Sequence, residues 1–129
     1  MRLLIILTVL FFSLAASQNR DSFVDKKNNL QWEDTIHTEE NDIKWAMAKS
    51  YCSSLFLDGY DDWRLPTKKE LILLVPFVKE HKLSYGTLGS YWSSQEYEED
   101  DLNAWAVYLD TAHAFDDDKC NTASVRCVR

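Results

Sequence analysis

The sequence predicts an α+β domain in which two helices pack on a small antiparallel sheet. Helical periodicity of apolar residues is confined to residues 42–75, whereas strand-like patterns dominate residues 90–129. A separate hairpin pattern precedes the helices at residues 23–32. Helices and strands that are segregated along the chain in this way are typical of α+β folds, and the length of residues 18–129 suits a single domain.

The N-terminus has the pattern of a secretory signal peptide. A positive charge precedes the apolar run LLIILTVLFFSL, and the small residues Ala15 and Ser17 suit cleavage before Gln18. The alternative is a retained membrane anchor, but the run is shorter than the roughly 20 residues of a spanning helix. We therefore expect a signal peptide at residues 1–17 and a secreted or periplasmic domain at 18–129, with no stable membrane insertion of the mature chain.

The charge of the chain disfavours polyanionic partners. Lys and Arg number 14 against 21 Asp and Glu, a formal net charge of −7 that becomes −8 without Arg2. Binding to nucleic acid requires clustered basic residues that neutralise phosphates, and the sequence has no such cluster. The same charge disfavours anionic membrane surfaces. The acidic residues gather at 58–62, 96–101 and 116–118.

The first expected element is a β-hairpin. Residues 23–25 and 30–32 flank the polar run 26–29, and asparagine-rich runs of this kind tolerate the backbone conformations of tight turns. Leu30 and Trp32 are two residues apart and should share a face of the second strand.

The next element is a helix at residues 42–57. Its apolar side chains, including Cys52, fall on about half of the helix circumference. Cys52 should therefore face the core. We expect Asn41 or Asp42 to cap the start of the helix and Gly59 to end it.

A second helix begins after Thr67. The sequence TKKE is a capping box, in which Thr67 and Glu70 bond each other's backbone N–H groups. Pro66 biases the preceding residue to an extended conformation. We expect Pro76 to end or kink this helix.

Strand patterns follow the second helix. They cover residues 91–94, 104–109, 112–115 and 124–129, joined by an acidic loop at 95–103 and a turn at 116–122. The second pattern is apolar on both faces, which suits a central strand. The last pattern alternates, with Val125 and Cys127 on one face and Arg126 and Val128 on the other.

Three cysteines, Cys52, Cys120 and Cys127, follow the expected signal peptide. In an oxidising compartment they predict one disulfide and one remaining thiol. The sequence has no CxxC, so neither a redox motif nor a zinc knuckle is supported.

Several motifs together resemble a known family. They are Phe23-Val24-Asp25, Leu30-Gln31-Trp32, Trp45, Ala48, Tyr51-Cys52, Leu55, Gly59, the run DWRLPT at 62–67, Glu70-Leu71, the run YWSS at 91–94, Trp105 and the run VRCVR at 125–129. With them, nearly the whole mature chain resembles the Lcl C-terminal domain family. This is a bacterial secreted domain, largely of unknown function, named for a collagen-like adhesin.

The resemblance implies a C-type-lectin-like fold, shared at a distance with the formylglycine-generating enzymes. It also implies a disulfide between Cys52 and Cys127, with Cys120 as the spare thiol. The residue patterns agree, because Cys52 lies on the apolar side of its helix and Cys127 shares a face with Val125. Pairing of Cys120 with Cys127 is the alternative.

No catalytic constellation is evident, so we expect a protein that is not an enzyme. A Ser, Cys or Lys nucleophile needs an oriented base nearby, and His37, His81 and His113 are not spaced as a triad or a metal set. Formylglycine-generating enzymes need an active-site cysteine pair, whereas the resemblance assigns Cys52 and Cys127 to a structural disulfide.

Calcium is the only cofactor that the acidic residues suggest, and we expect none to be required. Ca²⁺ takes several carboxylate and carbonyl oxygens. The weak candidate ligands are Glu98, Asp100, Asp101, Asp116 and Asp118. The EPN, QPD and WND motifs of calcium-dependent lectins are absent. Solvated acids that keep the domain soluble are the favoured interpretation.

Two aromatic residues are candidate ligand contacts, and the DWRLPT run is interpreted as structural. Tyr97 lies in the acidic loop and is expected to be exposed, and Trp92 is a weaker candidate. Trp63, Arg64, Pro66 and Thr67 are expected to build the corner before the second helix. Trp63 should turn into the core, and Arg64 should pair with an acid such as Asp61 or Asp62, or with nearby carbonyls.

These observations predict a secreted or periplasmic, non-catalytic binding module with a glycan or a surface protein as its ligand, as in an adhesin. The namesake adhesin is linked to polyanionic glycans, but a net charge of −8 repels polyanions. The alternatives are a divergent enzyme of the formylglycine-generating type and a structural component of the cell envelope.

Overall fold

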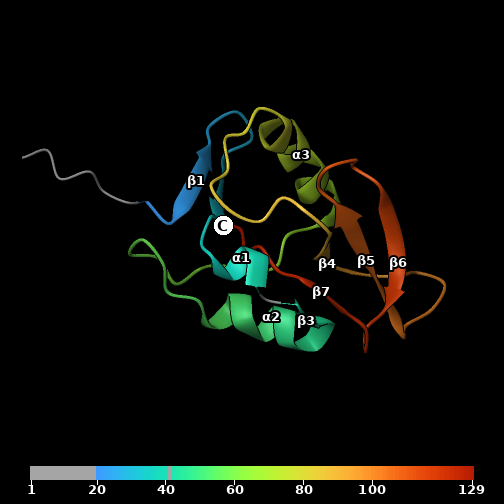
Figure 1. The fold of residues 1–129 in the computed structure, drawn as a ribbon. Helices are drawn as coiled ribbons and strands as arrows, with labels where there is room; N and C mark the ends of the chain where they lie inside the picture. Colours follow the sequence, from blue (N-terminus) through green and yellow to red (C-terminus); the bar gives the residue numbers. More distant parts are fainter. Residues whose placement is uncertain (1–19, 41) are drawn as a thin grey trace, which may run out of the picture.

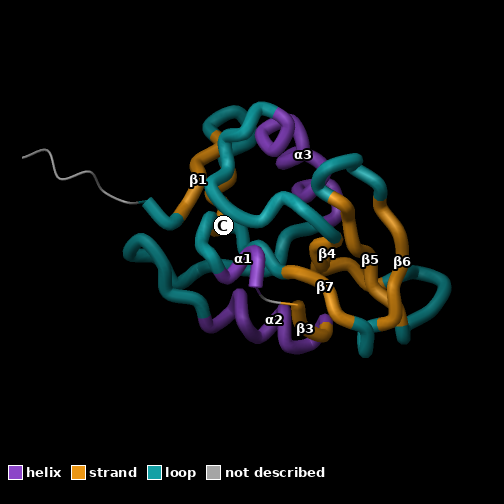
Figure 2. Tube along the Cα trace, viewed as in Figure 1, coloured by secondary structure: helices purple, strands orange, loops and turns teal. Residues whose placement is uncertain are grey.

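The structure is a computed structural model that describes residues 20–40 and 42–129 (Figures 1 and 2). The expected signal peptide at 1–17 lies outside the described residues. The elements are β1 (Ser22–Asp25), β2 (Leu30–Glu33), α1 (His37–Glu40), β3 (Asp42–Lys44), α2 (Trp45–Ser54), α3 (Lys68–Lys79), β4 (Ser90–Glu96), β5 (Asn103–Tyr108), β6 (Ala114–Asp118) and β7 (Thr122–Ser124). The α+β class is confirmed. Within the described ranges, no helix combines the length and apolarity needed to cross a bilayer.

The main sheet has five strands in the order β3-β7-β4-β5-β6, and β1 and β2 form the expected hairpin beside it. The expectation of a purely antiparallel sheet was wrong at one place. β7 pairs with β4 in parallel, through Tyr91 and Ser124, and with β3 in antiparallel fashion. This mixed pairing places the C-terminal strand inside the sheet, next to the first strand of the C-terminal half.

The two long helices cover opposite faces of this sheet, as Figure 1 shows for α2 and α3. Neighbouring residues of β4 separate the two cores, because Tyr91 packs with α3 and Trp92 packs with α2. β5 contributes Ala106 to the α2 side and Val107 to the α3 side. The prediction of a central strand that is apolar on both faces is thereby confirmed.

α2 is shorter than the predicted helix. Asp42–Lys44 pair with β7 as strand β3 instead of forming the first turn, and Lys44 precedes the helix without a side-chain cap. The expectation that Asp42 caps the helix was therefore wrong. The alternative cap, Asn41, lies outside the described residues. Gly59, with φ of +83°, does not end the helix but lies in a turn in which Leu57 and Tyr60 exchange backbone hydrogen bonds.

α3 begins as predicted and continues past its proline. Thr67 accepts a hydrogen bond from the Glu70 N–H, and the Glu70 carboxylate accepts from the Thr67 N–H, so the capping box is confirmed. We expected Pro76 to end or kink this helix. It does not end the helix, which runs on to Lys79. Pro76 lies on the exposed side, where water can reach the Ile72 carbonyl that the missing N–H leaves free.

The structure contains the disulfide between Cys52 and Cys127, with Cα atoms 5.4 Å apart. Cys120 is exposed and free, so the alternative pairing was wrong. β7 ends at Ser124, earlier than predicted, but the alternation predicted for the following residues is confirmed: Val125 and Cys127 pack on the α2 side and Val128 on the α3 side.

The C-terminal segment, residues 125–129, lies between two parts of the chain that precede it. On one side Gln31 and Arg129 exchange backbone hydrogen bonds of 2.8 and 2.9 Å. On the other side Arg64 and Val128 exchange two of 2.9 Å. The segment therefore joins the hairpin to the DWRLPT run.

The DWRLPT run is a structural corner. Trp63 is buried, and its indole N–H donates to the carbonyls of Leu57 and Tyr60. The Pro66 carbonyl accepts from the Ser94 N–H at 2.7 Å, which joins this run to YWSS.

Arg64 pairs with an acid, as expected, but that acid is Glu70 and not Asp61 or Asp62. Arg64 forms a two-pronged ion pair with Glu70 over 2.7 and 2.8 Å, because the capping box holds that carboxylate beside it. Asp62 instead binds Arg129.

Candidate functional site

The acidic loop between β4 and β5 is bonded mainly to itself. Tyr97 is half-buried, with its ring edge-on against Trp105 at 5.3 Å, and its hydroxyl donates to Glu99 over 3.1 Å. The Trp105 indole N–H donates to both Glu98 oxygens over 3.2 and 3.3 Å. Tyr97 is therefore less exposed than expected, because Trp105 covers one side of its ring.

The candidate calcium ligands are not gathered into a cation site. Several of these carboxylates already accept hydrogen bonds, Asp100 from Leu102, Asp116 from Asn103, and Asp118 from Cys120. Asp116–Asp118 were expected in a turn but belong to strand β6, which spreads the acids along an edge. Across residues 20–40 and 42–129, no three His, Cys, Asp or Glu side chains come together as a metal site would require.

The other candidate contacts lie apart from one another. Trp92 is fully buried, and its indole N–H donates to the Ile43 carbonyl over 2.8 Å, so it offers no surface to a ligand. The three histidines occupy different parts of the fold: His37 in α1, His81 after α3 and His113 before β6.

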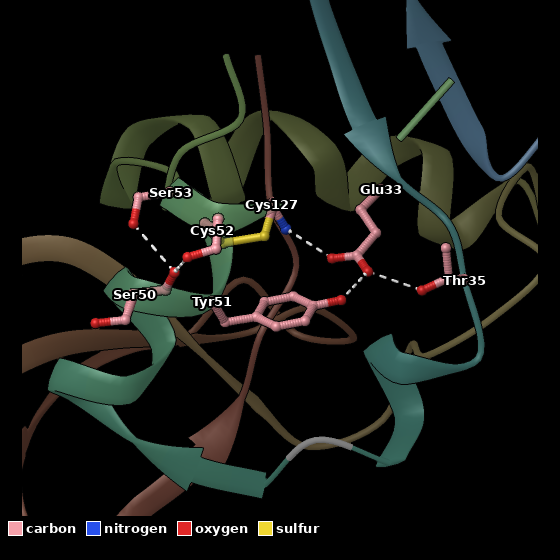
Figure 3. The surroundings of a disulfide bond; sticks show 8 residues. Glu33, Thr35, Ser50, Tyr51, Cys52, Ser53 and Cys127 are labelled. Atoms are coloured by element: carbon pink, nitrogen blue, oxygen red, sulfur yellow. Dashed lines mark hydrogen bonds between the residues drawn. A yellow bond between two sulfur atoms is a disulfide. The ribbon is translucent and has the colours of Figure 1, made fainter. Parts of the chain in front are cut away.

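A buried carboxylate that the sequence analysis did not single out marks a more developed site. Glu33, at the end of β2, is fully buried. Its Oε2 accepts from the hydroxyls of Tyr51, over 2.6 Å, and Thr35, over 2.7 Å, and its Oε1 accepts from the Cys127 N–H over 3.3 Å (Figure 3). Tyr51 reaches across from α2, one residue before the disulfide. The carboxylate thus joins the hairpin, α2 and the C-terminal segment.

A buried guanidinium lies on the other side of the Glu33 backbone. Arg126 is fully buried, and its Nη1 donates to the Glu33 carbonyl over 2.6 Å and lies 3.4 Å from Asp34 Oδ1. Its Nη2 donates to Thr38, Tyr85 and Gly86. Asp34 also accepts from the Ser84 and Tyr85 N–H groups over 2.8 and 2.9 Å. These contacts fix the loop after α3 against the hairpin.

This buried cluster carries an excess of negative charge. Glu33 and Asp34 are two carboxylates, and Arg126 is the one buried guanidinium among the described residues. Burial, followed by the hydrogen bond to Glu33 and that group's negative charge, raises the pKa of Tyr51 above its ordinary value. Tyr51 consequently remains a neutral donor to Glu33 throughout the physiological pH range.

A hollow of about 450 Å³ lies beside this cluster, and the residues around it include Glu33, Thr35, His37 and Tyr51. We refer to it as the Glu33 hollow. Its rim includes exposed apolar side chains, among them Ile36 and Phe56. A second, shallower depression of about 550 Å³ shares Tyr51 and follows α2 along Ile43, Ala46, Met47, Ser50 and Ser54. Tyr51 lines both depressions, and together we refer to them as the Tyr51 groove.

One signal in the sequence could have indicated this site. Arg126 stands within the otherwise apolar run VRCV, and an arginine in such a run needs a buried acidic partner. Glu33 and Asp34 directly follow the buried Trp32. The sequence does not show which acid reaches the arginine, because the two segments are more than 90 residues apart.

Comparison with known proteins identifies the family of the chain. A sequence model described as the Lcl C-terminal domain matches residues 21–129. Among curated proteins, no match is found. The match covers all the elements from β1 to the C-terminal segment, and the chain therefore belongs to the Lcl C-terminal domain family.

Proposed function

We propose that this chain is a secreted or periplasmic, non-catalytic binding module of C-type-lectin-like fold, and that its ligand is a segment of another protein bound in the Tyr51 groove. The buried disulfide supports a location outside the cytoplasm, since such bonds persist in oxidising compartments.

The observation that carries the proposal is the uncovered apolar surface around the groove. Phe56, Met47 and Ile36 are 72%, 58% and 47% exposed, and all three lie on the groove. Exposed apolar side chains that gather around a hollow are typical of sites that bind proteins or small ligands. Three such residues on adjoining elements are a costly surface to leave in water unless a partner covers them.

The walls of the groove are held rigidly. Cys52 ties α2 to the C-terminal segment, and Tyr51 ties the same helix to Glu33. A site whose side chains are fixed before binding loses little conformational entropy when the ligand arrives. The same disulfide weighs against the formylglycine-generating type of enzyme, because Cys52 and Cys127 are both fully buried and bonded to each other.

A glycan ligand is the second candidate, and a different surface favours it. Tyr108, His113 and Phe115 hold their rings nearly parallel at the β5–β6 edge, with centroids 5.0 to 6.4 Å apart. Amphipathic rings of this kind present an apolar face beside polar groups. A glycan array with and without calcium tests this candidate, and loss of any signal in a His113→Ala variant would assign it to the three rings.

Selection of displayed peptides on the purified, disulfide-bonded protein tests the first candidate. We expect groove-binding peptides that bind the wild-type protein and a Leu102→Ser variant equally, and a Phe56→Ser variant much more weakly. Leu102 is the matched control, because it is 67% exposed but lies in the acidic loop. Peptides that bind all three proteins equally would place the ligand elsewhere, and failure in both assays would favour a structural role in the envelope.

A further inference from the structure

We infer that Tyr85 is a specificity-determining residue of the Tyr51 groove, presented to the bound segment by a loop that the protein fixes through its backbone. This inference rests on the proposed function and adds to it the residue that selects among protein segments. Three features carry it: the anchorage of residues 84–86, the fit of Gly86 against α1, and the exposure of the Tyr85 ring.

The backbone of residues 84–86 is held by buried charged groups. The Asp34 carboxylate accepts from the N–H groups of Ser84 and Tyr85 over 2.8 and 2.9 Å. The Arg126 guanidinium donates to the carbonyls of Tyr85 and Gly86. Asp34 and Arg126 are both buried, and hydrogen bonds with a charged partner are among the strongest in proteins. Both peptide groups that flank the Cα atom of Tyr85 are therefore fixed.

The next residue, Gly86, is fixed in the same way. Its N–H donates to the Glu39 carboxylate over 2.9 Å, and the residue is buried. A Cβ atom at this position, where φ is +55°, would lie 2.6 Å from the Thr38 carbonyl oxygen and 2.7 Å from the Tyr91 hydroxyl. A side chain here would therefore clash and strain the backbone. All these contacts use backbone atoms of the loop, so none of them depends on which side chain stands at position 85.

The Tyr85 side chain is left partly in water. Tyr85 is 38% exposed and is one of the residues around the Glu33 hollow, as are Ile36 and Phe56 from two other parts of the chain. Compact loops that serve only to connect two elements are commonly packed by their own side chains. In this loop the backbone makes the bonds to buried groups, and the ring stays available at the groove.

A tyrosine in this position suits the recognition of a protein segment. Its ring offers a large contact area at a small cost in side-chain entropy, and its hydroxyl can bond a polar group of the ligand. Because the backbone of the loop is fixed before the ligand arrives, binding does not have to order it. A different side chain at position 85 should therefore change which segments bind and leave the fold unchanged.

The peptides selected on the groove provide the first test. A Tyr85→Ala variant should bind the peptides that require Phe56 about tenfold more weakly, or worse, and should keep the wild-type midpoint of urea unfolding. Leu88→Ala is the matched control, because Leu88 lies in the same loop and is 79% exposed but is not among the residues around either depression. It should change neither binding nor the midpoint. Gly86→Ala, in contrast, should lower the midpoint clearly.

A second selection, made on the Tyr85→Ala protein, tests specificity directly. It should yield peptides with a larger side chain at one position, which fills the space of the missing ring. These peptides should bind the variant about tenfold or more tightly than the wild-type protein, a preference that a merely structural role of Tyr85 would not produce.

Three results would each overturn this inference and leave the proposed function standing. They are unchanged binding of the first peptides to Tyr85→Ala, recovery of the same peptides in the second selection, and a loss of stability as large as that of Gly86→Ala. Absence of any peptide that requires Phe56 would overturn both.

Discussion

The hydroxyl of Tyr51 on α2 donates a 2.6 Å hydrogen bond to Oε2 of the fully buried Glu33 on β2. The bond joins a helix on one face of the main sheet to the separate hairpin, and it lies one residue from the disulfide. It also forms the inner wall of the Glu33 hollow. The stability of the fold and the shape of the groove thus depend on the same pair of side chains.

Substitution of Tyr51 by Phe should lower stability. The change removes a hydrogen bond to a buried carboxylate, and such bonds contribute about 1.5 kcal/mol or more to the free energy of unfolding. Urea unfolding of the two proteins measures the difference. Tyr97→Phe is the control, because the Tyr97 hydroxyl donates to the exposed Glu99. Removal of that hydrogen bond should change the free energy of unfolding by no more than about 0.5 kcal/mol. Equal effects of the two substitutions would contradict the role given to Glu33.

The effect of Tyr51→Phe on stability should also depend on pH. Because burial and Glu33 raise the pKa of Tyr51 above its ordinary value of 10.0, folding favours the neutral phenol. This contribution is fully present below about pH 10 and is lost as the pH rises from there through the folded pKa. The free energy of unfolding should therefore fall more steeply above about pH 10 in the wild-type protein than in Tyr51→Phe. Parallel curves would show that the Tyr51 pKa is not raised.

Arg64→Ala should lower stability without affecting the groove. Its ion pair with Glu70 is bidentate but half-exposed, and pairs of this kind contribute about 0.5 to 1 kcal/mol. Burial raises the pKa of Glu70, but hydrogen bonds from Arg64 and from the Thr67 backbone lower it by more. The pKa of Glu70 therefore lies below its ordinary value. The contribution of the pair is thus present at neutral pH and is lost as the pH falls through that lowered pKa.

Urea unfolding at neutral and acidic pH checks this prediction. Lys69→Ala, at the neighbouring exposed position of α3, serves as the control. Loss of peptide binding in Arg64→Ala with stability unchanged would instead make Arg64 a ligand contact.

Removal of the disulfide should be the most damaging of these changes. The bond closes a loop of 75 residues, for which the chain-entropy model gives about 4 kcal/mol. The double variant Cys52→Ala and Cys127→Ala should lose about that much stability in urea unfolding. Cys120→Ser should lose almost none, because its side chain is exposed. Thiol titration of the unfolded wild-type protein should find one free thiol; a count of three would show that the bond does not form.

Millimolar calcium should leave the melting temperature unchanged. Four of the five candidate ligands, Glu98, Asp100, Asp116 and Asp118, already accept hydrogen bonds from neighbouring groups, and the five are spread over the β4–β5 loop and β6. A ligand that binds only the folded state raises its stability, so a clear increase with calcium and none with magnesium would show a site that the arrangement of these side chains does not suggest.

Features that depend on residues close together in the sequence could be predicted, whereas features that depend on distant partners could not. The capping box at Thr67 and Glu70 depends on residues three apart and was predicted correctly. Strand β3 was predicted as helix, because its conformation depends on pairing with β7, about 80 residues later. The central position of β5 was predictable from its composition alone, since a strand that is covered on both faces is apolar throughout.

The candidate site was less predictable than the fold. Glu33 and Arg126 are each ordinary surface residue types, and only the tertiary structure brings them together. The aromatic and acidic loop attracted a functional interpretation because its composition is unusual, yet its groups bond mostly to one another. Composition identifies residues that are able to bind a ligand, whereas only their spatial arrangement shows which of them are still free to do so.

The position of the C-terminal segment has a consequence for the order in which the fold forms. Residues 125–129 provide the backbone partners of Gln31 and Arg64 and the sulfur partner of Cys52. These residues are synthesised after all the segments that they join. The hairpin and α2 therefore lack these partners until synthesis has reached residues 125–129. Contacts between such distant parts of a chain slow folding. Loss of residues 125–129 would therefore act as a folding defect, because three separate parts of the fold depend on them.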